Sequence, residues 1–342
     1  MLSKQKTLHF LIIQTAFIGD VILATPVIEK LHQFFPGAKI DFLLRKGNES
    51  LLEHHPYINE IIMWDKKQNK SKNLWQIGKK IRQFNYDYVI NLHRFASSGL
   101  ITAFSRAKHR IGFDKNPLSF LYSKIIKHEI GNGKHEVQRN LDLVKELTDD
   151  KLTHPKLYPT IEHFKNVQFY KYRGDTTPAF EYICIAPTSV WFTKQLPKEK
   201  WITLINQLPE DYFIYLLGAS SDKETCEEIR ISSKHSMVEN LAGKLSFLDS
   251  AALMRDAKMN YVNDSAPMHL ASAMNAPTTA VFCSTIPAFG FSPLAAYSKT
   301  IETQLQLDCR PCGLHGFKSC PKGHFKCATT IKIDHLTATL SN

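Results

Sequence analysis

The chain has 342 residues, of which 43% are hydrophobic, and a formal net charge of +11 at pH 7. This length predicts about two domains, each with a substantial core. Every apolar run is much shorter than the roughly 20 residues that a membrane-spanning helix needs, and the N-terminus lacks a signal-peptide pattern. We therefore expect a cytoplasmic protein.

The positive charge is concentrated in the first part of the chain. Residues 1–150 contain 23 Lys and Arg against 15 Asp and Glu, a net of +8, which leaves +3 for the remainder. An anionic partner is expected there, and charge alone does not choose between nucleic acid, a membrane surface and an acidic small molecule. No nucleic-acid motif is present, and the lysines of residues 66–84 are typical of a solvated helix face. We therefore expect no nucleic-acid partner.

Strands alternate with helices in this first part. The apolar run 10–13 predicts a buried strand and residues 21–31 have helical spacing, so residues 14–20 turn between them. Further strands are predicted at 39–44, 60–64, 86–92 and in HRIGF, with helices at 72–84 and 138–148. The alternation predicts a parallel sheet with helices on both faces. Residues 149–178, with several prolines, are predicted to be a linker with one embedded short strand.

A second alternation follows this linker. Strands are predicted at 182–186, 212–217, 260–262 and 278–283, and helices at 198–208, 222–231, 246–257 and 267–275. The predicted fold class is therefore α/β, with two Rossmann-like, doubly wound domains facing a cleft. We place the first domain at residues 1–165, the second at 178–327 and a C-terminal segment at 328–342.

Asp20 follows Gly19 at the carboxyl edge of the first predicted strand, where open α/β sheets bind their ligands. Gly19 allows a close approach of another molecule to the backbone. Two interpretations remain open from the spacing: Asp20 is a general base at a cleft, or it caps the helix that follows.

Four basic residues are predicted near the same edge, each at or just after the end of a strand. Several cations at one edge suit an acidic acceptor, which an arginine grips through two parallel hydrogen bonds. The alternative is that each is a surface residue in a weak ion pair. These acceptor-binding candidates are Arg45, His93, Arg94 and Arg110.

The loops after the strands of the second domain suit a nucleotide. Residues 186–197 contain hydroxyls and a lysine that can hydrogen-bond and neutralise a diphosphate, namely Thr188, Ser189, Thr193 and Lys194. Asp222, close after Gly218, is either a ribose-binding acid or a helix cap.

The loop 262–274 is the most informative of these. Asp264 and Ser265 stand just before Pro267, a residue that the first helical turn tolerates, so free N–H groups and the positive helix end face the cleft. A phosphate or a sugar hydroxyl binds readily at such a terminus. His269 on the first turn is either a donor to the phosphates or a structural histidine.

Four of the seven cysteines cluster near the end of the chain, with His315 and His324 between them. The spacing C-x2-C is a common half of a zinc site, but the other two cysteines are separated by six residues. A cytoplasmic compartment disfavours disulfides. The cluster is therefore either a structural metal site, with zinc as the metal, or a set of reduced thiols packed in a loop. Its members are Cys309, Cys312, Cys320 and Cys327.

Five motifs occur in one order along the chain: TAFIGDVILATPV, RIGF, APTSVWFTKQLP, NDSAPMHLASAM and CRPCGLHGFKSCPKGHFKC. Together they resemble bacterial glycosyltransferase family 9, which includes the ADP-heptose:lipopolysaccharide heptosyltransferases. The resemblance covers nearly the whole chain. It implies the two-domain GT-B architecture and sugar transfer with inversion, with no cofactor or metal needed for the chemistry.

The resemblance also assigns roles to individual residues. Asp20 matches the family's base, Lys194 its phosphate-binding lysine and Asp222 its ribose-contacting acid. Asp264, followed by His269, matches the aspartate that contacts the donor sugar. The adenine-side apolar residue falls on Leu245. Two positions depart from the family pattern, because Ala266 stands where many members have Gly and Leu196 replaces a common Trp.

The sequence thus predicts an inverting, metal-independent glycosyltransferase. It moves a heptose or similar sugar from a nucleotide diphosphate donor, with ADP-heptose expected, to a lipopolysaccharide core or related glycan. The acceptor is expected to be acidic and lipid-linked, with peripheral contact to the inner membrane face. The alternatives are a sugar-nucleotide epimerase or hydrolase on the same two-domain plan, and a non-catalytic nucleotide-sugar-binding protein.

Overall fold

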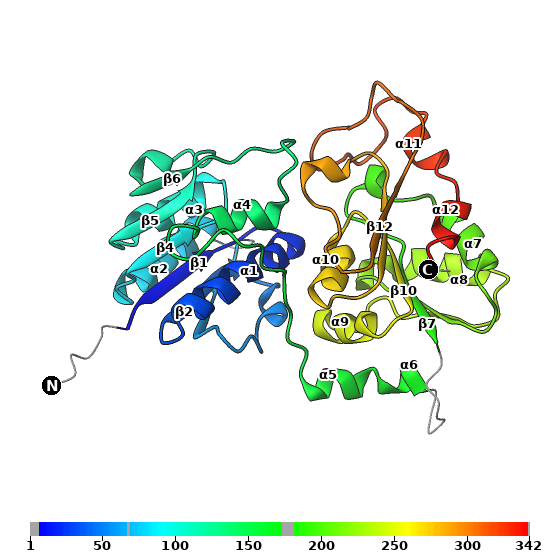
Figure 1. Ribbon diagram of the computed structural model, residues 1–342, viewed down its shortest axis with the longest axis horizontal. Coiled ribbons are helices and arrows are strands. Elements are labelled where there is room, and N and C mark those ends of the chain that lie inside the picture. Colours follow the sequence, from blue (N-terminus) through cyan, green and yellow to red (C-terminus); the bar gives the residue numbers. More distant parts are fainter. Residues whose placement is uncertain (1–6, 67–68, 173–180, 341–342) are drawn as a thin grey trace. The chain divides into compact units, whose positions relative to one another are not determined.

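The computed structural model describes residues 7–66, 69–172 and 181–340. The chain divides into two compact units (Figure 1). The first unit comprises Met1–Ile130 and Lys134–Tyr158, and the second comprises Gly131–Gly133 and Pro159–Asn342. No helix among these described residues is long and apolar enough to cross a membrane.

The first unit is built on a six-stranded parallel sheet of order β3-β2-β1-β4-β5-β6. Its central strand β1 pairs with both β2 and β4, and every residue of β1 after His9 is buried. The strands are β1 (His9–Ile13), β2 (Lys39–Arg45), β3 (Glu60–Trp64), β4 (Tyr88–Asn91), β5 (His109–Phe113) and β6 (Lys124–Ile126).

Helices pack in pairs in this unit, α1 with α4 and α2 with α3. Leu11 and Ile13 of β1 share a core with Ile77 and Ile81 of α2, since alternate strand residues point to one face. The helices are α1 (Ile18–Phe34), α2 (Lys70–Gln83), α3 (Ala96–Phe104) and α4 (Glu136–Asp142), with short turns η1 (Glu49–Leu51) and η2 (Ser119–Leu121).

The second unit repeats this plan with a six-stranded parallel sheet of order β12-β11-β10-β7-β8-β9. The central strands β7 and β10 are buried at every residue. The strands are β7 (Tyr182–Ala186), β8 (Phe213–Leu216), β9 (Val238–Asn240), β10 (Met259–Asn263), β11 (Thr278–Phe282) and β12 (Ser298–Glu302).

Eight helices and three short turns accompany this sheet in the described part of the second unit. The helices are α5 (Ile161–Asn166), α6 (Gln168–Tyr172), α7 (Lys198–Gln207), α8 (Lys223–Ser232), α9 (Phe247–Arg255), α10 (Ala266–Ala273), α11 (Lys326–Thr329) and α12 (Asp334–Thr337). The turns are η3 (Phe192–Lys194), η4 (Ser220–Asp222) and η5 (Pro287–Phe289).

The predicted α/β class with two Rossmann-like, doubly wound domains is confirmed, because each unit has a wholly parallel six-stranded sheet with helices. The boundary differs from the predicted one, since the units divide at Tyr158 and Pro159. The predicted C-terminal segment is part of the second unit, where Ala328, Ile331 and Leu336 lie in its core.

The prediction of a short strand within the linker is wrong for the described linker residues. Residues 149–172 contain α5 and α6 instead, and residues 173–178 lie outside the described residues. Thr160 is the cap residue before α5, and its N–H donates to Nδ1 of His163 at 3.0 Å. A local cap of this kind stabilises a short helix. The six residues of α5 have too weak a hydrophobic periodicity to predict it from sequence.

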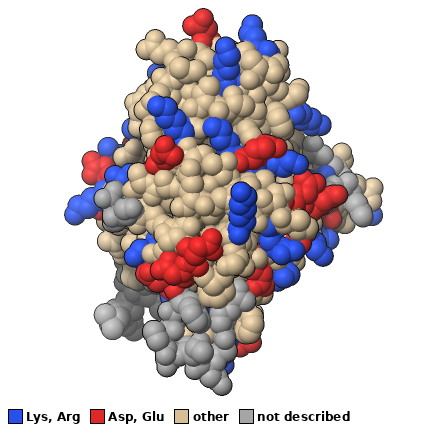
Figure 2. Space-filling model, turned by 90° about the vertical axis from the view of Figure 1, so that its right-hand side faces the viewer, with Lys and Arg blue, Asp and Glu red and all other residues tan. Residues whose placement is uncertain are grey.

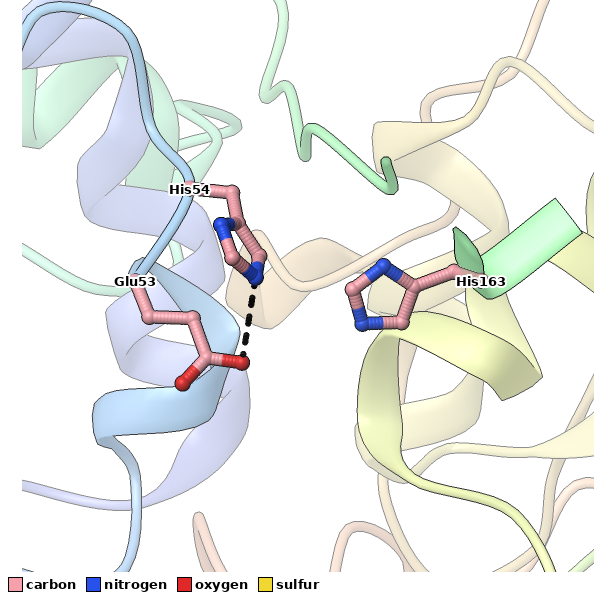
Figure 3. A group of neighbouring side chains, drawn as sticks. All are labelled: Glu53, His54 and His163. Carbon is pink, nitrogen blue, oxygen red and sulfur yellow. Dashed lines mark ion pairs between the residues drawn. The ribbon is translucent and has the colours of Figure 1, made fainter. Parts of the chain in front are cut away.

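Figure 3 labels His163 together with Glu53 and His54 of the first unit. Glu53 and His54 form an exposed ion pair of 3.5 Å. Each of these residues therefore has a partner within its own unit, since His163 accepts from the Thr160 N–H at the start of α5.

Figure 2 shows one face of the molecule, on which Lys and Arg side chains are interspersed with Asp and Glu side chains. A surface with mixed signs of this kind does not attract a polyanion as a single-sign patch does. Local groups at the sheet edges, described next, are therefore more informative than the overall charge.

Candidate active site

The first group of predicted site residues surrounds the start of α1. Asp20 is the third residue of this helix, and its Oδ2 accepts a hydrogen bond from the Phe17 N–H at 3.1 Å. The carboxylate thus stabilises the first turn, although the cap residue itself is Phe17 rather than Asp20. Such a contact occupies one oxygen and leaves the other able to accept a proton.

The ionisation of Asp20 is perturbed in the direction that suits a base. Burial, followed by the negative charge of Glu136, raises the pKa of Asp20 to about 6, against opposing contributions from the Phe17 N–H and Arg94. A carboxylate with this pKa is still ionised at neutral pH and accepts a proton more readily than an ordinary aspartate. The cap interpretation is wrong as to position, since Phe17 is the cap residue and Asp20 is the third residue of the helix. Its contact with the Phe17 N–H does not exclude a role as base.

Two residues that the sequence reasoning missed, Thr15 and Lys66, lie at this sheet edge. Lys66 Nζ donates to the Thr15 carbonyl oxygen at 2.7 Å and to Thr15 Oγ1 at 2.9 Å. The predicted residue His93 has its Nδ1 3.2 Å from the same hydroxyl. Lys66 lies two residues after the end of β3, so its position past a strand end was the available signal.

His93 differs from the predicted cation. Burial, together with the nearby charges of Lys66 and Arg94, lowers the pKa of His93 to about 3. The imidazole is therefore neutral at pH 7, and its contact with Thr15 gives it a structural place in the loop after β1. It does not supply a positive charge for an acidic acceptor.

The three predicted arginines separate into two groups. Arg45 is the last residue of β2, with its guanidinium carbon 5.9 Å from the Phe17 ring centroid, and Arg94 lowers the Asp20 pKa. Both therefore lie near the start of α1. Arg110 is instead the second residue of β5, and it donates to the Leu121 carbonyl at 3.1 Å and the Ala107 carbonyl at 2.7 Å.

The prediction that Arg110 ends a strand is wrong. β5 continues to Phe113, so Arg110 lies toward the amino end of the strand and away from the edge where Asp20 lies. Its guanidinium is used to hold two backbone carbonyls.

The second group of predicted residues gathers where three neighbouring strands of the second unit end. Lys194 Nζ lies 2.7 Å from Asp264 Oδ2, and Thr285 Oγ1 donates to that oxygen at 2.6 Å. Lys194 follows β7, Asp264 follows β10 and Thr285 follows β11, and these strands are adjacent in the sheet. The carboxyl ends of parallel strands share one edge, which explains why distant residues meet.

This ion pair is largely withdrawn from solvent. Asp264 is 5% exposed, and the side chain of Lys194 is 14% exposed. A buried carboxylate that is paired and hydrogen-bonded keeps its charge, whereas an unpaired one does not. The arrangement therefore holds a positive ammonium at the sheet edge in a fixed position.

The backbone of residues 186–197 is held in place by side chains of its neighbours. Asn263 Oδ1 accepts from the Leu196 N–H at 2.9 Å, and Gln195 Nε2 donates to the Ser189 carbonyl at 2.6 Å. Asn263 Nδ2 also donates to the Thr188 carbonyl at 3.4 Å. Thr188 and Ser189 are half-buried, with their backbone carbonyls rather than their hydroxyls in these contacts.

Thr193 was predicted to bind phosphate, but the structure uses its side chain in contacts within the protein. Its side chain is buried, and Oγ1 accepts from the Phe317 N–H at 2.8 Å and lies 3.0 Å from Ser284 Oγ. The Thr193 N–H in turn donates to the Phe317 carbonyl at 3.1 Å. Thr193 therefore attaches the loop that carries Lys194 to the cysteine-rich segment.

The start of α10 lies immediately after Asp264. Ser265 is the cap residue, Ala266 begins the helix and Pro267 occupies its first turn, as predicted from the sequence. Ser265 and Ala266 are half-buried, whereas His269 is buried on the same turn. The positive end of this helix adds to the charge of Lys194.

Asp222 and Leu245 lie at the ends of the neighbouring strands β8 and β9. Asp222 Oδ2 accepts from the Ala219 N–H at 2.8 Å, a contact that closes the turn η4. Asp222 is the cap residue of α8 by position, but its side chain makes no capping hydrogen bond to that helix. A Cβ at Gly218 would lie 2.9 Å from Asp222 Cβ, which explains the glycine there. Both Asp222 and Leu245 are half-buried.

The four clustered cysteines are close to one another. Cys309 Sγ lies 3.8 Å from His324 Nε2, and Cys312 Sγ donates to the Cys309 carbonyl at 2.9 Å. Burial, followed by Cys312, Cys320 and Cys309, raises the pKa of Cys327 to about 11. Among the described residues, no three donors of this cluster have ligand atoms all within 4.8 Å of one another.

The chain was compared with known families and proteins. The family model described as glycosyltransferase family 9 (heptosyltransferase) matches residues 74–315, a range that includes Lys194 and Asp264 but begins after Asp20. A thioredoxin model matches residues 1–87, a quarter of the chain. That segment contains no cysteine, and its strands are all parallel.

Individual proteins agree with the first match. Lipopolysaccharide heptosyltransferase 3 of Escherichia coli is 28% identical over 281 residues, which cover 79% of this chain and 82% of that protein. The glycosyl transferase family 9 structure from Veillonella parvula has a TM-score of 0.84 at 21% identity, covering 99% and 97% of the chains. E. coli ADP-heptose lipopolysaccharide heptosyltransferase II has a TM-score of 0.79 at 21% identity, covering 98% and 99%.

These neighbours share the whole two-domain architecture, which confirms the GT-B fold that the sequence motifs implied. The family model covers more than two thirds of the residues and includes the loops that hold the Lys194–Asp264 pair. The chain is a glycosyltransferase that belongs to glycosyltransferase family 9, the heptosyltransferase family.

Proposed function

We propose that the protein is an inverting glycosyltransferase that moves a heptose from ADP-heptose to a lipopolysaccharide core or related glycan. The observation that carries this proposal is the buried pair of Lys194 and Asp264 beside the start of α10. An ammonium and a positive helix end together suit an anionic diphosphate. The similar E. coli proteins are lipopolysaccharide heptosyltransferases, and one is named for ADP-heptose, which supports this donor and acceptor.

In the proposed donor complex, Lys194 Nζ binds the diphosphate oxygens. Asp264 holds this ammonium in place and accepts from hydroxyls of the donor sugar, with Ser265 and Ala266 at the adjoining helix end. Thr188 and Ser189 on the loop after β7, and His269 on the first turn of α10, add polar contacts. Asp222 accepts from the ribose, and Leu245 packs against the adenine.

In the proposed reaction, Asp20 accepts the proton of the acceptor hydroxyl. The acceptor oxygen forms a bond to the anomeric carbon as the bond from that carbon to the diphosphate breaks, so the configuration inverts. The charge that develops on the departing ADP is stabilised by Lys194 and the α10 terminus, so the chemistry needs no divalent cation. The acceptor on Asp20 and the donor sugar must meet in the reacting complex.

Arg45 and Arg94 are the proposed contacts for acidic groups of the acceptor. Both lie near the start of α1, and an arginine binds carboxylate or phosphate through two parallel hydrogen bonds. A lipid-linked acceptor places the reaction at the inner membrane face, with the protein in peripheral contact.

A transfer assay tests the proposal. The purified chain is incubated with ADP-heptose and a lipopolysaccharide acceptor that lacks heptose, and the acceptor is examined by mass spectrometry. We expect a mass gain of one heptose together with one ADP released per transfer. UDP-glucose and GDP-mannose serve as donor controls, and NMR of the product gives the anomeric configuration.

Other outcomes of this assay would contradict the proposal. Release of ADP that does not depend on acceptor indicates a hydrolase, and conversion of the sugar without ADP release indicates an epimerase. Binding of ADP-heptose without turnover in the presence of several acceptors indicates a non-catalytic binder. Retention of the anomeric configuration would overturn the single-displacement mechanism.

We also propose that Cys309, Cys312, Cys320 and Cys327 hold a structural zinc ion. Four thiolates are a donor set that zinc prefers, and tetrahedral binding places the sulfurs about 3.8 Å apart for Zn–S bonds of about 2.3 Å. The sulfurs must therefore approach one another on binding. The segment contacts the Lys194 loop through Thr193 and Phe317, so the ion would fix that loop without taking part in the reaction.

Elemental analysis of the purified protein tests the metal. We expect roughly one equivalent of zinc, lost in Cys320→Ser and kept in Cys226→Ala, which changes a core cysteine outside the cluster. A content below about 0.2 equivalents in the unmodified protein would contradict the site.

A further inference from the structure

The helices α1 and α4 pack against each other in the first unit. Asn140 Nδ2 of α4 donates to the Leu23 carbonyl of α1 at 3.0 Å. Both helices start near the carboxyl edge of the sheet, since α1 follows β1 and the residues before α4 are tied to Asp114 just after β5 by the His128 N–H at 2.9 Å. The helices therefore run in the same direction.

This contact places two acidic residues opposite each other. Asp20 lies about one turn before Leu23, and Glu136 lies about one turn before Asn140. Glu136 thus faces the first turn of α1 from the first turn of α4. Consistent with this position, its negative charge is the largest single charge effect on the Asp20 carboxyl, whose pKa it raises.

Glu136 is held as a fixed anion. It is 6% exposed, its Oε2 accepts from Arg139 Nε at 2.6 Å, and His128 Nε2 lies 3.4 Å from the same oxygen. Burial disfavours its charge, but the contacts with His128 and Arg139 outweigh this and lower the pKa of Glu136 to about 2. The carboxylate therefore stays ionised throughout the range in which Asp20 titrates.

We propose that Glu136 is a positioning residue for the reaction, a fixed negative charge that makes Asp20 a stronger base. It does not touch the substrate and acts only through Asp20. This inference rests on the proposed role of Asp20 as base. A base whose pKa lies just below the working pH combines a large ionised fraction with a strong drive to accept a proton, which is the benefit that Glu136 provides.

Other charged groups lie on the elements around α1. Arg139 lies on α4 with Glu136, Arg45 ends β2 and Arg94 follows β4. Asp41 of β2 lies on the other face of the sheet, since it is two residues before Leu43, which shares a core with α2, and it is bonded to His9, Asn59 and Tyr86. Only Glu136 and Arg94 are charges that shift the Asp20 pKa appreciably, and they act in opposite directions.

The pH dependence of kcat/KM for transfer tests the proposal. The base form of Asp20 is lost as the pH falls through its pKa, so the unmodified protein is expected to lose activity below about pH 6. Glu136→Gln removes the like charge while keeping a hydrogen-bond acceptor, and we expect the acidic limb to move down by about half to one pH unit. Glu136→Asp, which keeps the charge, should restore the limb toward its original position.

Two further variants separate this effect from a loss of structure. Glu146→Gln changes an exposed acid of the same unit, paired with Lys124, and should leave the limb where it was. If Glu136→Gln does not fold because Arg139 loses its ionic partner, the double variant Glu136→Gln, Arg139→Met removes both charges and should show the same downward shift.

An acidic limb that stays in place in a folded variant without the Glu136 charge would overturn the inference. This failure is distinguishable from failure of the proposed function. If Asp20→Asn still transfers sugar normally, Asp20 is not the base and both ideas fail. If Asp20→Asn is inactive but the limb does not move in Glu136→Gln, only the role of Glu136 is wrong.

Discussion

Replacing Asp20 by Asn is expected to lower kcat/KM for sugar transfer by about two to four powers of ten, the usual contribution of a general base. The amide has nearly the shape of the carboxylate but cannot take the acceptor proton. Its oxygen can still accept from the Phe17 N–H, so the first turn of α1 should persist. Steady-state kinetics with ADP-heptose and a heptose-deficient acceptor measure the effect.

Asp222→Asn provides a matched control for this experiment. Asp222 also accepts a backbone N–H three residues before it, in this case that of Ala219 at the start of the short turn η4. This variant should weaken the donor's binding without abolishing turnover at saturating donor. A normal rate in folded Asp20→Asn would show that the base lies elsewhere.

Replacing Lys194 by Ala is expected to have the second largest effect. The variant loses the cation beside the diphosphate and leaves Asp264, which is 5% exposed, without its ionic partner. We expect kcat/KM to fall by about two to three powers of ten, as when one preorganised group that stabilises transition-state charge is removed. ADP affinity should fall as well, because the lysine contacts the diphosphate in the ground state too.

Lys198→Ala is the control for this variant. Lys198 begins α7 four residues later, is half exposed and pairs with Glu228 at 2.7 Å. An exposed pair of this kind contributes little, so its removal should leave transfer and ADP binding within about twofold of normal. Equal behaviour of the two lysine variants would contradict the role of Lys194.

The sequence predicted those parts of the fold and site that depend on local patterns. The strand at 182–186 coincides with β7, since five apolar residues followed by a proline leave little choice. Asp20, Lys194 and Asp264 were found because each follows a buried strand, and the ends of parallel strands meet at one edge.

Tertiary contacts explain what the sequence did not reveal. The strand end at Phe113 cannot be read from HRIGF, so Arg110 was placed at the wrong end of β5. The neutral state of His93 depends on its burial beside Lys66, a neighbour distant in the chain. Thr193 looked like a phosphate ligand, yet its partners are Ser284 and Phe317, which no local pattern connects to it.

Glu136 is the clearest example of this limit. No sequence pattern distinguishes it from the other acidic residues. Its proposed role depends on the packing of α4 against α1 and on the hydrogen bond that it accepts from Arg139 Nε. Edge strands β9 and β12 were missed for a related reason, because short polar segments such as SKTIE become strands only when a sheet is present to pair with them.

The central claim is a division of labour, in which the first unit supplies the base and the second unit holds the nucleotide. Calorimetric titration of ADP into Asp20→Asn and Lys194→Ala, set beside the transfer rate of each, tests it most directly. The account predicts that Asp20→Asn binds ADP with unchanged affinity while its transfer rate falls by about two to four powers of ten, and that Lys194→Ala is weakened in both ADP affinity and transfer. An Asp20→Asn protein that loses ADP binding to the same degree as Lys194→Ala would contradict it.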